Sequence, residues 1–218
     1  AASGKKFVHT WMHNGPVRVD NEKMSKSLGN FFTVREVLKQ YPAEVIRYFL
    51  VSSHYRSHIN YSEENLQTAK AALERFYHAL KDFNLAAVES AAHTVFEDRF
   101  HAAMQDDFNT PEAIGVLFEL ARDINRLRDT DPALALQQAA LLRRLGGILG
   151  ILQDVPESFL RAGGDDLDPT YIDDLIVRRN TARAEKNWVE ADRIRDVLKA
   201  LKVVLEDRDG KTTWRVES

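Results

Sequence analysis

The apolar residues recur mostly at intervals of three and four, a spacing that predicts amphipathic α-helices over most of the chain. Local signals mark where several of these helices begin. Thr33 and Glu36 form a capping-box pattern, Ser62 is a plausible N-cap, and Thr110 with Pro111 opens a third helix. The expected helices cover about residues 34–41, 42–50, 62–84, 96–104, 110–127, 132–152, 168–176 and 187–201. The pattern therefore predicts a mainly α protein.

A short β-hairpin is predicted within residues 7–20. Its turn would be Asn14-Gly15, a dipeptide typical of tight turns, with Trp11–His13 and Val17–Val19 as the two strands. Pro16 lacks a backbone N–H, so it fits only at the edge of a sheet. The hairpin is expected to lead directly into a polar loop.

The last fifty residues predict a small α+β module. Residues 163–166 read Gly-Gly-Asp-Asp, which makes them the best candidate for a linker. After two short helices, Val203–Leu205 and Thr213–Val216 read as strands joined by a type I′ turn at Asp209-Gly210. The chain then divides into a front segment, an antiparallel helical bundle at residues 61–162 and the module at residues 168–218.

Charge is unevenly distributed over these three parts. The chain has 218 residues and a net charge of −3, with +5 in residues 1–60, −9 in residues 61–168 and +1 in the remainder. A basic front and an acidic middle suit a protein that meets a polyanion at selected places. A pI of about 6.2 argues against a general nucleic-acid coat.

The composition also limits location and redox chemistry. No apolar run is long enough to span a membrane, and no signal-peptide pattern opens the chain. There is no cysteine, so the chain has neither a disulfide nor a thiolate zinc site. We expect a cytoplasmic protein without membrane contact.

The candidate chemistry lies in the polar loop Lys23-Met24-Ser25-Lys26-Ser27. Lysine is a compact charge on a flexible stem and can follow a phosphate that moves, while serine hydroxyls donate to phosphate oxygens. Gly29 allows the backbone to come close to a ligand. For a generic pair of lysines, a solvated loop would be the better interpretation.

This five-residue string resembles the signature loop of the class I aminoacyl-tRNA synthetases, which binds ATP phosphates during amino-acid activation. With Trp11–Gly15, the following Glu22–Asn30 and Phe31-Phe32-Thr33, the resemblance narrows to the cysteinyl-tRNA synthetase family. It implies that Lys26, assisted by Lys23, stabilises the leaving pyrophosphate. It also implies that Lys23, Met24, Ser25, Lys26 and Ser27 bind ATP.

The resemblance also assigns roles to the other parts. It implies that residues 1–60 are the end of a catalytic domain with a stem-contact fold. The loop at residues 54–57, His-Tyr-Arg-Ser, could contact the tRNA backbone or simply be solvated. Asp106 and Asp107 could be catalytic or bind magnesium, but beside a helix start they are better explained as structural.

Arginines and aromatic residues in the terminal module form a composition that holds unpaired bases. The alternative is a charged helix surface with pairs of opposite charge. The resemblance implies an anticodon reader with Arg183, Trp188, Asp192 and Asp207 in contact with tRNA. Trp188 could instead belong to the core. Lys202 departs from the family, where glycine usually follows the helix.

The resemblance covers only the second half of the family's protein. The nucleotide-binding first half and the zinc ligands of the parent lie upstream of Ala1, so we expect this chain to be part of a longer polypeptide. The implied function is ATP-dependent activation of cysteine and its transfer to tRNA, by a monomer. A tRNA-binding module without catalysis and a ligase joining cysteine to an amino sugar are the alternatives.

Overall fold

The computed structural model describes residues 4–30, 33–85, 88, 94–161, 169–208 and 211–216. These residues form two compact units. The first unit is built from Ala1–Leu73 and Asn84–Leu152, and the second from Glu74–Phe83 and Gln153–Ser218. The predicted linker at residues 163–166 lies outside the described residues.

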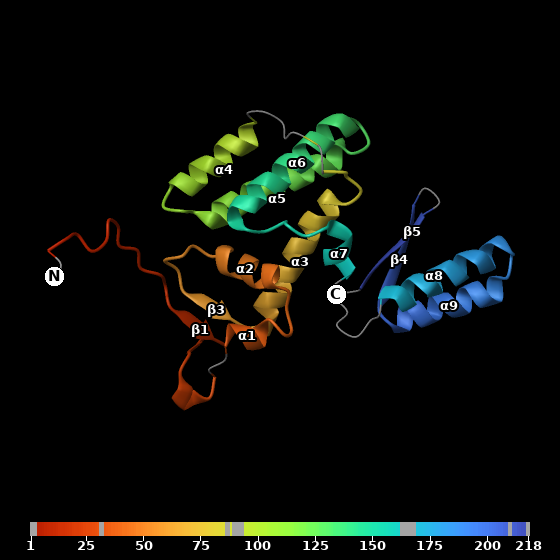
Figure 1. Ribbon diagram of the computed structural model, residues 1–218, viewed down its shortest axis with the longest axis horizontal. Coiled ribbons are helices and arrows are strands. Elements are labelled where there is room, and N and C mark those ends of the chain that lie inside the picture. The colour runs from red at the N-terminus through yellow and green to blue at the C-terminus, as the bar shows by residue number, and fades with distance from the viewer. Residues whose placement is uncertain are drawn as a thin grey trace. The chain divides into compact units, whose positions relative to one another are not determined.

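The structure is mainly helical with a few short strands, which confirms the predicted fold class (Figure 1). The helices of the front part and the bundle are α1 (Val34–Val37), α2 (Ala43–Val51), α3 (Glu63–Leu80), α4 (Val95–Gln105), α5 (Thr110–Leu127) and α6 (Pro132–Leu149). A one-turn 3-10 helix covers Lys26–Leu28. The remaining elements are α7 (Pro156–Arg161), α8 (Pro169–Ala184), α9 (Trp188–Ala200), β4 (Val203–Arg208) and β5 (Lys211–Val216).

Most predicted helix starts are confirmed at the level of side chains. The Thr33 hydroxyl accepts from the Glu36 N–H at 3.3 Å, and Glu36 Oε2 accepts from the Thr33 N–H at 2.6 Å. Ser62 Oγ caps α3 by accepting from the Asn65 N–H. The prediction that Thr110 caps α5 is wrong, because Asn109 does so one residue earlier.

The helical bundle is formed by α4, α5 and α6, with α5 packed against the other two (Figure 1). Its core is made of side chains that are almost fully buried: Phe100, Leu117, Leu120, Ile124, Leu141, Leu142 and Leu145. The apolar spacing of this helix also predicts an inward position for Ile148, and that prediction is wrong, since this side chain is 52% exposed. The helix ends at Gly150, where φ is +71°, and the chain turns so that Ile151 and Leu152 complete the core instead.

Gly146 allows this return of the chain. A Cβ atom at Gly146 would lie 2.8 Å from Leu152 Cδ1, closer than real Cβ contacts. The Ile151 N–H donates to the Gly146 carbonyl at 3.0 Å. From the sequence, the pair Gly146-Gly147 would permit a close contact with a helix; at Gly146 the close contact is made with the returning chain instead.

The predicted N-terminal hairpin is displaced along the chain. Residues 11–13 form no strand, and β1 (Val17–Val19) pairs antiparallel with β2 (Glu22–Lys23) and parallel with β3 (Ile59–Tyr61). Gly15 serves close approach rather than a turn, because a Cβ atom there would lie 2.0 Å from the Ser57 carbonyl oxygen. Its N–H donates to the Tyr55 carbonyl at 2.8 Å.

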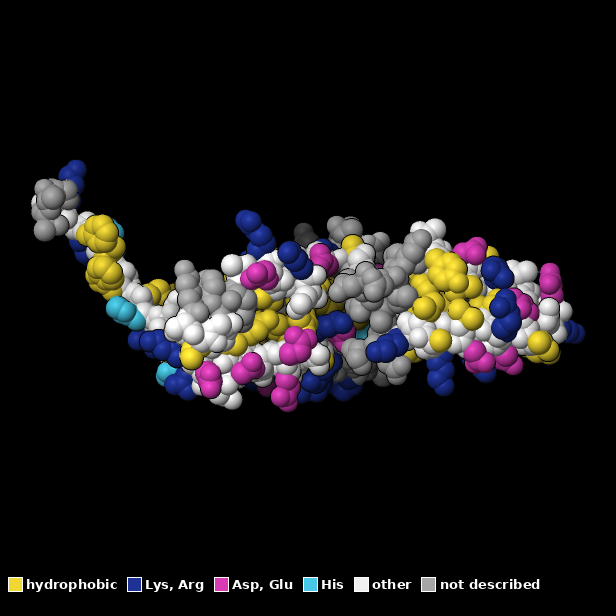
Figure 2. Space-filling model, turned by 90° about the horizontal axis from the view of Figure 1, so that it is seen from below, with side chains coloured by type: hydrophobic (Ala, Val, Ile, Leu, Met, Phe, Trp, Pro, Cys, Tyr) yellow, Lys and Arg dark blue, Asp and Glu magenta, His cyan; other side chains and the backbone are white. Residues whose placement is uncertain are grey.

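The segment before Gly15 is an extended arm with exposed apolar side chains (Figure 2). Phe7 is 85% exposed and Trp11 is 70% exposed. Their rings lie 6.3 Å apart, so they contact each other but no core. Within residues 4–14, the part of the arm that the structure describes, no side chain is buried.

In the terminal module, α8 and α9 pack together and β4 pairs antiparallel with β5 (Figure 1). Their shared core consists of Ile172, Leu175, Ile176, Ile194, Leu198, Val203 and Trp214. Asn187 caps α9, as predicted, by accepting from the Glu190 N–H. The predicted pairing of the two strands as a hairpin is confirmed, but the predicted turn, Asp209-Gly210, lies outside the described residues.

Among the helices that the structure describes, none has the length and apolar character needed to cross a membrane.

Candidate nucleotide and nucleic-acid interface

The polar loop at Lys23–Ser27, called the lysine loop below, follows a tight hairpin between β1 and β2. Asp20 and Asn21 form its turn with φ values of +48° and +66°, the left-handed geometry of a type I′ turn. Lys23 lies opposite Arg18 in the register of the hairpin and is exposed. The pairing of β1 with β2 therefore fixes the backbone position of Lys23, the last residue of β2.

One side chain closes the loop. Asn30 Oδ1 accepts from the Ser25 N–H at 2.8 Å, and Asn30 Nδ2 donates to the Lys23 carbonyl at 3.2 Å. Within the loop, Ser25 Oγ lies 3.1 Å from Ser27 Oγ and accepts from the Leu28 N–H at 3.3 Å. The two serine hydroxyls are thus held beside each other on the exposed loop.

Sequence reasoning assigned no role to Asn30. The available signal was its residue type, because asparagine side chains bond readily to nearby backbone groups. Gly29 before it has φ +67°, which favours glycine. Met24 is half-buried, and Lys26 begins the 3-10 helix, although its side chain lies outside the described residues.

The basic loop at residues 54–57 is fastened to the bundle by Asp107. Arg56 Nε and Nη2 donate to the two carboxylate oxygens of Asp107 at 2.6 and 3.2 Å. The Tyr55 hydroxyl donates to Asp107 Oδ1 at 2.7 Å, and His54 Nε2 lies 3.0 Å from the Asp107 carbonyl oxygen. The hydrogen bonds from Arg56 and Tyr55 lower the pKa of Asp107. The positive charge of Arg56 is therefore already paired with a carboxylate within the protein.

The backbone at Asp107 is unusual as well. Asp107 and Phe108 have consecutive positive φ values of +52° and +54°. This region is unfavourable for a residue with a bulky side chain. The contacts and the backbone together support the structural interpretation of Asp107.

Asp207 and Arg183, predicted as separate tRNA contacts, are brought together in the terminal module. Asp207 Oδ2 pairs with Arg183 Nη1 at 3.0 Å and with Arg179 Nη2 at 3.1 Å. Thr212 Oγ1 donates to Asp207 Oδ1 at 2.5 Å. The hydrogen bonds from Arg179 and Thr212 lower the pKa of Asp207 to about 2. At neutral pH this carboxylate is ionised and can accept hydrogen bonds but cannot donate them.

The adjacent Glu206 faces the other way, as successive residues of a strand do. It accepts from Lys81 Nζ at 2.6 Å, and Lys81 also donates to Thr213 Oγ1 at 3.1 Å. The hairpin is thus held on both faces, which fixes the strand that carries Asp207.

Trp188 and Asp192 lie apart from that cluster in the contacts that the structure describes. The Trp188 side chain is 59% exposed at the first turn of α9, so the alternative that it belongs to the core is not supported. Asp192 is exposed and pairs with Arg195 at 3.1 Å. Both side chains remain accessible to a ligand.

The arginines of α8 and α9 are all engaged in ion pairs: Arg178, Arg179, Arg183, Arg193 and Arg195. Arg178 and Arg193 both pair with Glu190, at 3.5 and 2.7 Å. The alternative of a charged helix surface therefore describes the module as it stands. Any polyanion would have to exchange with these carboxylates.

Three family models match consecutive parts of the chain. Residues 1–71 match the tRNA synthetases class I (C) catalytic domain, residues 99–153 the DALR domain, and residues 165–215 the cysteinyl-tRNA ligase anticodon-binding domain. Proteins named cysteine–tRNA ligase from Azotobacter vinelandii and Stutzerimonas stutzeri are 60% and 58% identical over 99% of this chain. Over nearly its whole length, the chain is therefore homologous to cysteine–tRNA ligases. It spans about half the length of these curated relatives, 47% of each.

The matched segments of this ligase family coincide with the candidate sites. The lysine loop lies in the segment that matches the catalytic domain, and Arg183, Trp188, Asp192 and Asp207 lie in the segment that matches the anticodon-binding domain. Asp107 lies within the segment that matches the DALR domain.

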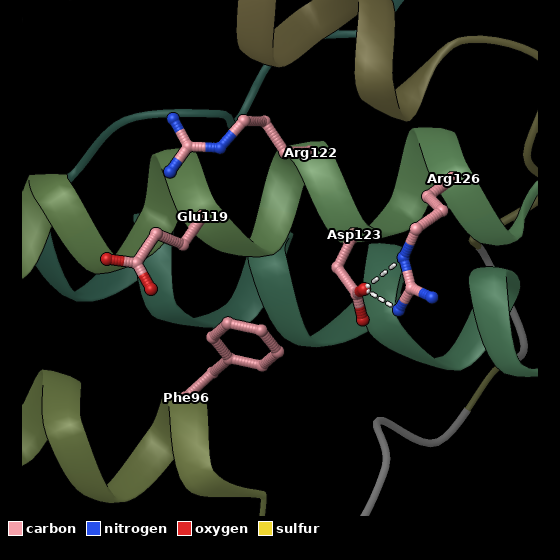
Figure 3. A pocket seen from close by; sticks show the side chains of 5 residues that line it. All are labelled: Phe96, Glu119, Arg122, Asp123 and Arg126. Atoms are coloured by element: carbon pink, nitrogen blue, oxygen red, sulfur yellow. Dashed lines mark hydrogen bonds and ion pairs between the residues drawn. The ribbon is translucent and has the colours of Figure 1, made fainter.

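A surface pocket of about 320 Å³ lies beside α5, between the start of α4 and residues of the segment that matches the DALR domain (Figure 3). Its lining residues are Phe96, Glu119, Arg122, Asp123 and Arg126. Asp123 and Arg126 turn toward each other and are hydrogen-bonded (Figure 3), and Glu119 is held by Arg99 at 2.6 and 2.9 Å. The carboxylates of this pocket are therefore engaged with arginines.

Proposed function

We propose that this chain supplies the ATP-phosphate-binding loop and the anticodon-reading module of a cysteine–tRNA ligase. The observation that supports this most is the match to a cysteinyl-tRNA ligase anticodon-binding domain in a chain that also has an ordered lysine loop. The same match favours a tRNA ligase over the amino-sugar ligase. We further propose that residues 1–60, 61–162 and 168–218 form three separate domains or domain parts of the parent enzyme. We also propose that this enzyme is a monomer in the cytoplasm.

The lysine loop would act on the leaving group of amino-acid activation. The carboxylate of cysteine attacks the α-phosphorus of ATP, and pyrophosphate leaves with growing negative charge. Cations that follow this charge stabilise the transition state more than the ground state. We assign this role to Lys26, with Lys23 assisting, while Met24, Ser25 and Ser27 complete the ATP-binding loop held by Asn30.

The terminal module would read the anticodon of the tRNA in its single-stranded loop. Asp192 and Asp207 provide acceptors for base amino and imino groups, Arg183 provides a forked donor, and the exposed Trp188 ring can stack on a base.

The chain's own residues do not fit the zinc site of the parent. It has no cysteine, and among the described residues no three His, Asp or Glu side chains lie close enough to hold a metal ion. No step proposed for this chain therefore involves zinc.

The test uses the full-length parent and cysteine-dependent pyrophosphate exchange. Lys26→Ala is expected to slow exchange about 100-fold, equivalent to about 3 kcal/mol, with little change in cysteine binding. Lys39→Ala removes another exposed lysine outside the loop and should leave exchange unchanged. Unchanged exchange in Lys26→Ala would remove this lysine from the mechanism.

A second variant tests whether the Asn30 side chain holds the loop in its conformation. Asn30→Asp keeps the acceptor for the Ser25 N–H but loses the donor to the Lys23 carbonyl, so we expect slower exchange at an unchanged melting temperature.

The 218-residue chain alone should bind tRNA without forming cysteinyl-adenylate, because the other substrate-binding half of the parent is not part of it. Adenylate formation by the homogeneous chain would contradict the assignment.

A further inference from the structure

Arg179 is the less exposed of the two arginines that pair with Asp207. Its side chain is 11% exposed, whereas the side chain of Arg183, which binds the same carboxylate oxygen, is 46% exposed. Both arginines come from α8, on successive turns. An RNA base at this surface could reach Arg183 and Asp207, while Arg179 lies beneath them.

Besides Arg183, two side chains hold the Asp207 carboxylate. Arg179 Nη2 donates to Oδ2 at 3.1 Å, and the Thr212 hydroxyl donates to Oδ1 at 2.5 Å. Thr212 is itself held by Asn180 Nδ2, which donates to its hydroxyl oxygen at 3.1 Å. The hydroxyl has a single proton, so the bond from Asn180 leaves it free to point at Asp207.

We propose that Arg179 is a positioning residue for anticodon discrimination, which holds the Asp207 carboxylate in one orientation when Arg183 moves to a nucleotide. The inference rests on the proposed function, in which Asp207 accepts hydrogen bonds from a base. A carboxylate has about four acceptor positions. Arg179 and Thr212 occupy positions that face the module, and the exchange of Arg183 exposes one that faces outward.

The charge balance supports this division of roles. If Arg183 were the sole partner of Asp207, its departure would leave an unpaired carboxylate close to a polyanion. With Arg179 in place, Asp207 keeps a counter-charge, and the hydrogen bond from Arg179 is the main reason that the pKa of Asp207 is lowered. Arg183 can then exchange partners at little cost.

The test measures discrimination in the full-length parent, as the ratio of kcat/KM for cognate tRNA to that for tRNA with a substituted anticodon. Arg179→Gln removes the charge and the fork, and we expect the ratio to fall about tenfold or more, as in Asp207→Asn. The double variant should be no worse than Asp207→Asn alone. Pyrophosphate exchange without tRNA should be unchanged in each variant.

Arg178→Gln is the matched control. Arg178 is the neighbouring arginine on α8, but it pairs with Glu190 at 3.5 Å rather than with Asp207. It should keep the discrimination ratio of the parent. Arg179→Lys retains the charge without the fork and should restore part of the ratio.

The possible results distinguish the positioning role of Arg179 from the proposed base reading by Asp207. Additive losses in the double variant, or an Arg179→Gln variant that keeps discrimination while Asp207→Asn loses it, would overturn the role of Arg179 alone. An Asp207→Asn variant with full discrimination would overturn the proposed base reading and the inference with it. If Arg179→Gln fails to fold, Thr212→Val, which lacks the donor, must show the same loss relative to Thr212→Ser.

Discussion

Replacing Trp188 by alanine should weaken tRNA binding and leave the fold intact. The indole is 59% exposed at the first turn of α9, so its truncation removes little buried area. Substitutions at such positions change the free energy of unfolding by no more than about 0.5 kcal/mol. The loss of one stacked base should cost about 1–3 kcal/mol, which raises Kd about 5- to 150-fold.

Trp214 provides a matched control in the same module. It is 4% exposed, lies in the core cluster and donates from Nε1 to Asp173 Oδ1 at 2.7 Å. Trp214→Ala should destabilise the module by about 3–5 kcal/mol, the range for large aromatic residues in cores. The two tryptophans therefore separate surface recognition from packing.

The assay is a titration of the full chain with cognate tRNA and with anticodon-substituted tRNA at one fixed salt concentration, alongside thermal melting. For a module of this size, 0.5 kcal/mol corresponds to a melting shift of about 2–4 °C. A Trp188→Ala variant that lowers the melting temperature as much as Trp214→Ala does would show that Trp188 is needed for packing. A Trp188→Ala variant that binds both tRNAs as the parent chain does would show that the indole takes no part in recognition.

Two further predictions concern the same module. Lys202 follows α9 with φ +56°, so Lys202→Gly should stabilise the module by about 1 kcal/mol, whereas Lys199→Gly inside the helix should destabilise it by about the same amount; equal melting temperatures for the two variants would contradict this. The pKa of Asp207 is lowered to about 2, so the stability it contributes is present above about pH 4 and is lost as the pH falls toward about 2. Melting as a function of pH should show this acid-sensitive step in the parent chain and a smaller one in Asp207→Asn.

Much of the helical structure could be predicted because its signals are local. The apolar spacing and the caps at Thr33, Ser62 and Asn187 depend on residues a few positions apart. Asn14-Gly15 misled because the same dipeptide that favours a turn also allows close contact with a distant segment. Only the structure shows that this segment includes Ser57.

The candidate site shows the same limit. The lysine loop and the residues of the terminal module were identified from the sequence, through a local string and a resemblance. The pairing of Arg56 with Asp107 and of Arg179 with Asp207 was not, because these partners are far apart in the chain and no periodicity links them. Charge patterning along a helix shows where arginines are exposed, but not which carboxylate another segment brings to them.

The parallel pairing of β1 with β3 has a consequence for the order of folding. Val17 lies opposite Ile59 and Val19 opposite Tyr61, whereas β2 adds only two residue pairs to the other edge of β1. Bringing β1 and β3 together closes the whole chain segment between Val19 and Ile59, which is entropically unfavourable until the contacts between the two strands form. A nascent chain that has emerged only as far as Asn30 contains the whole lysine loop but not the strand that supports it. The contacts that close the loop are local, but the sheet beneath it is complete only after α1 and α2 have been synthesised and β3 has paired with β1.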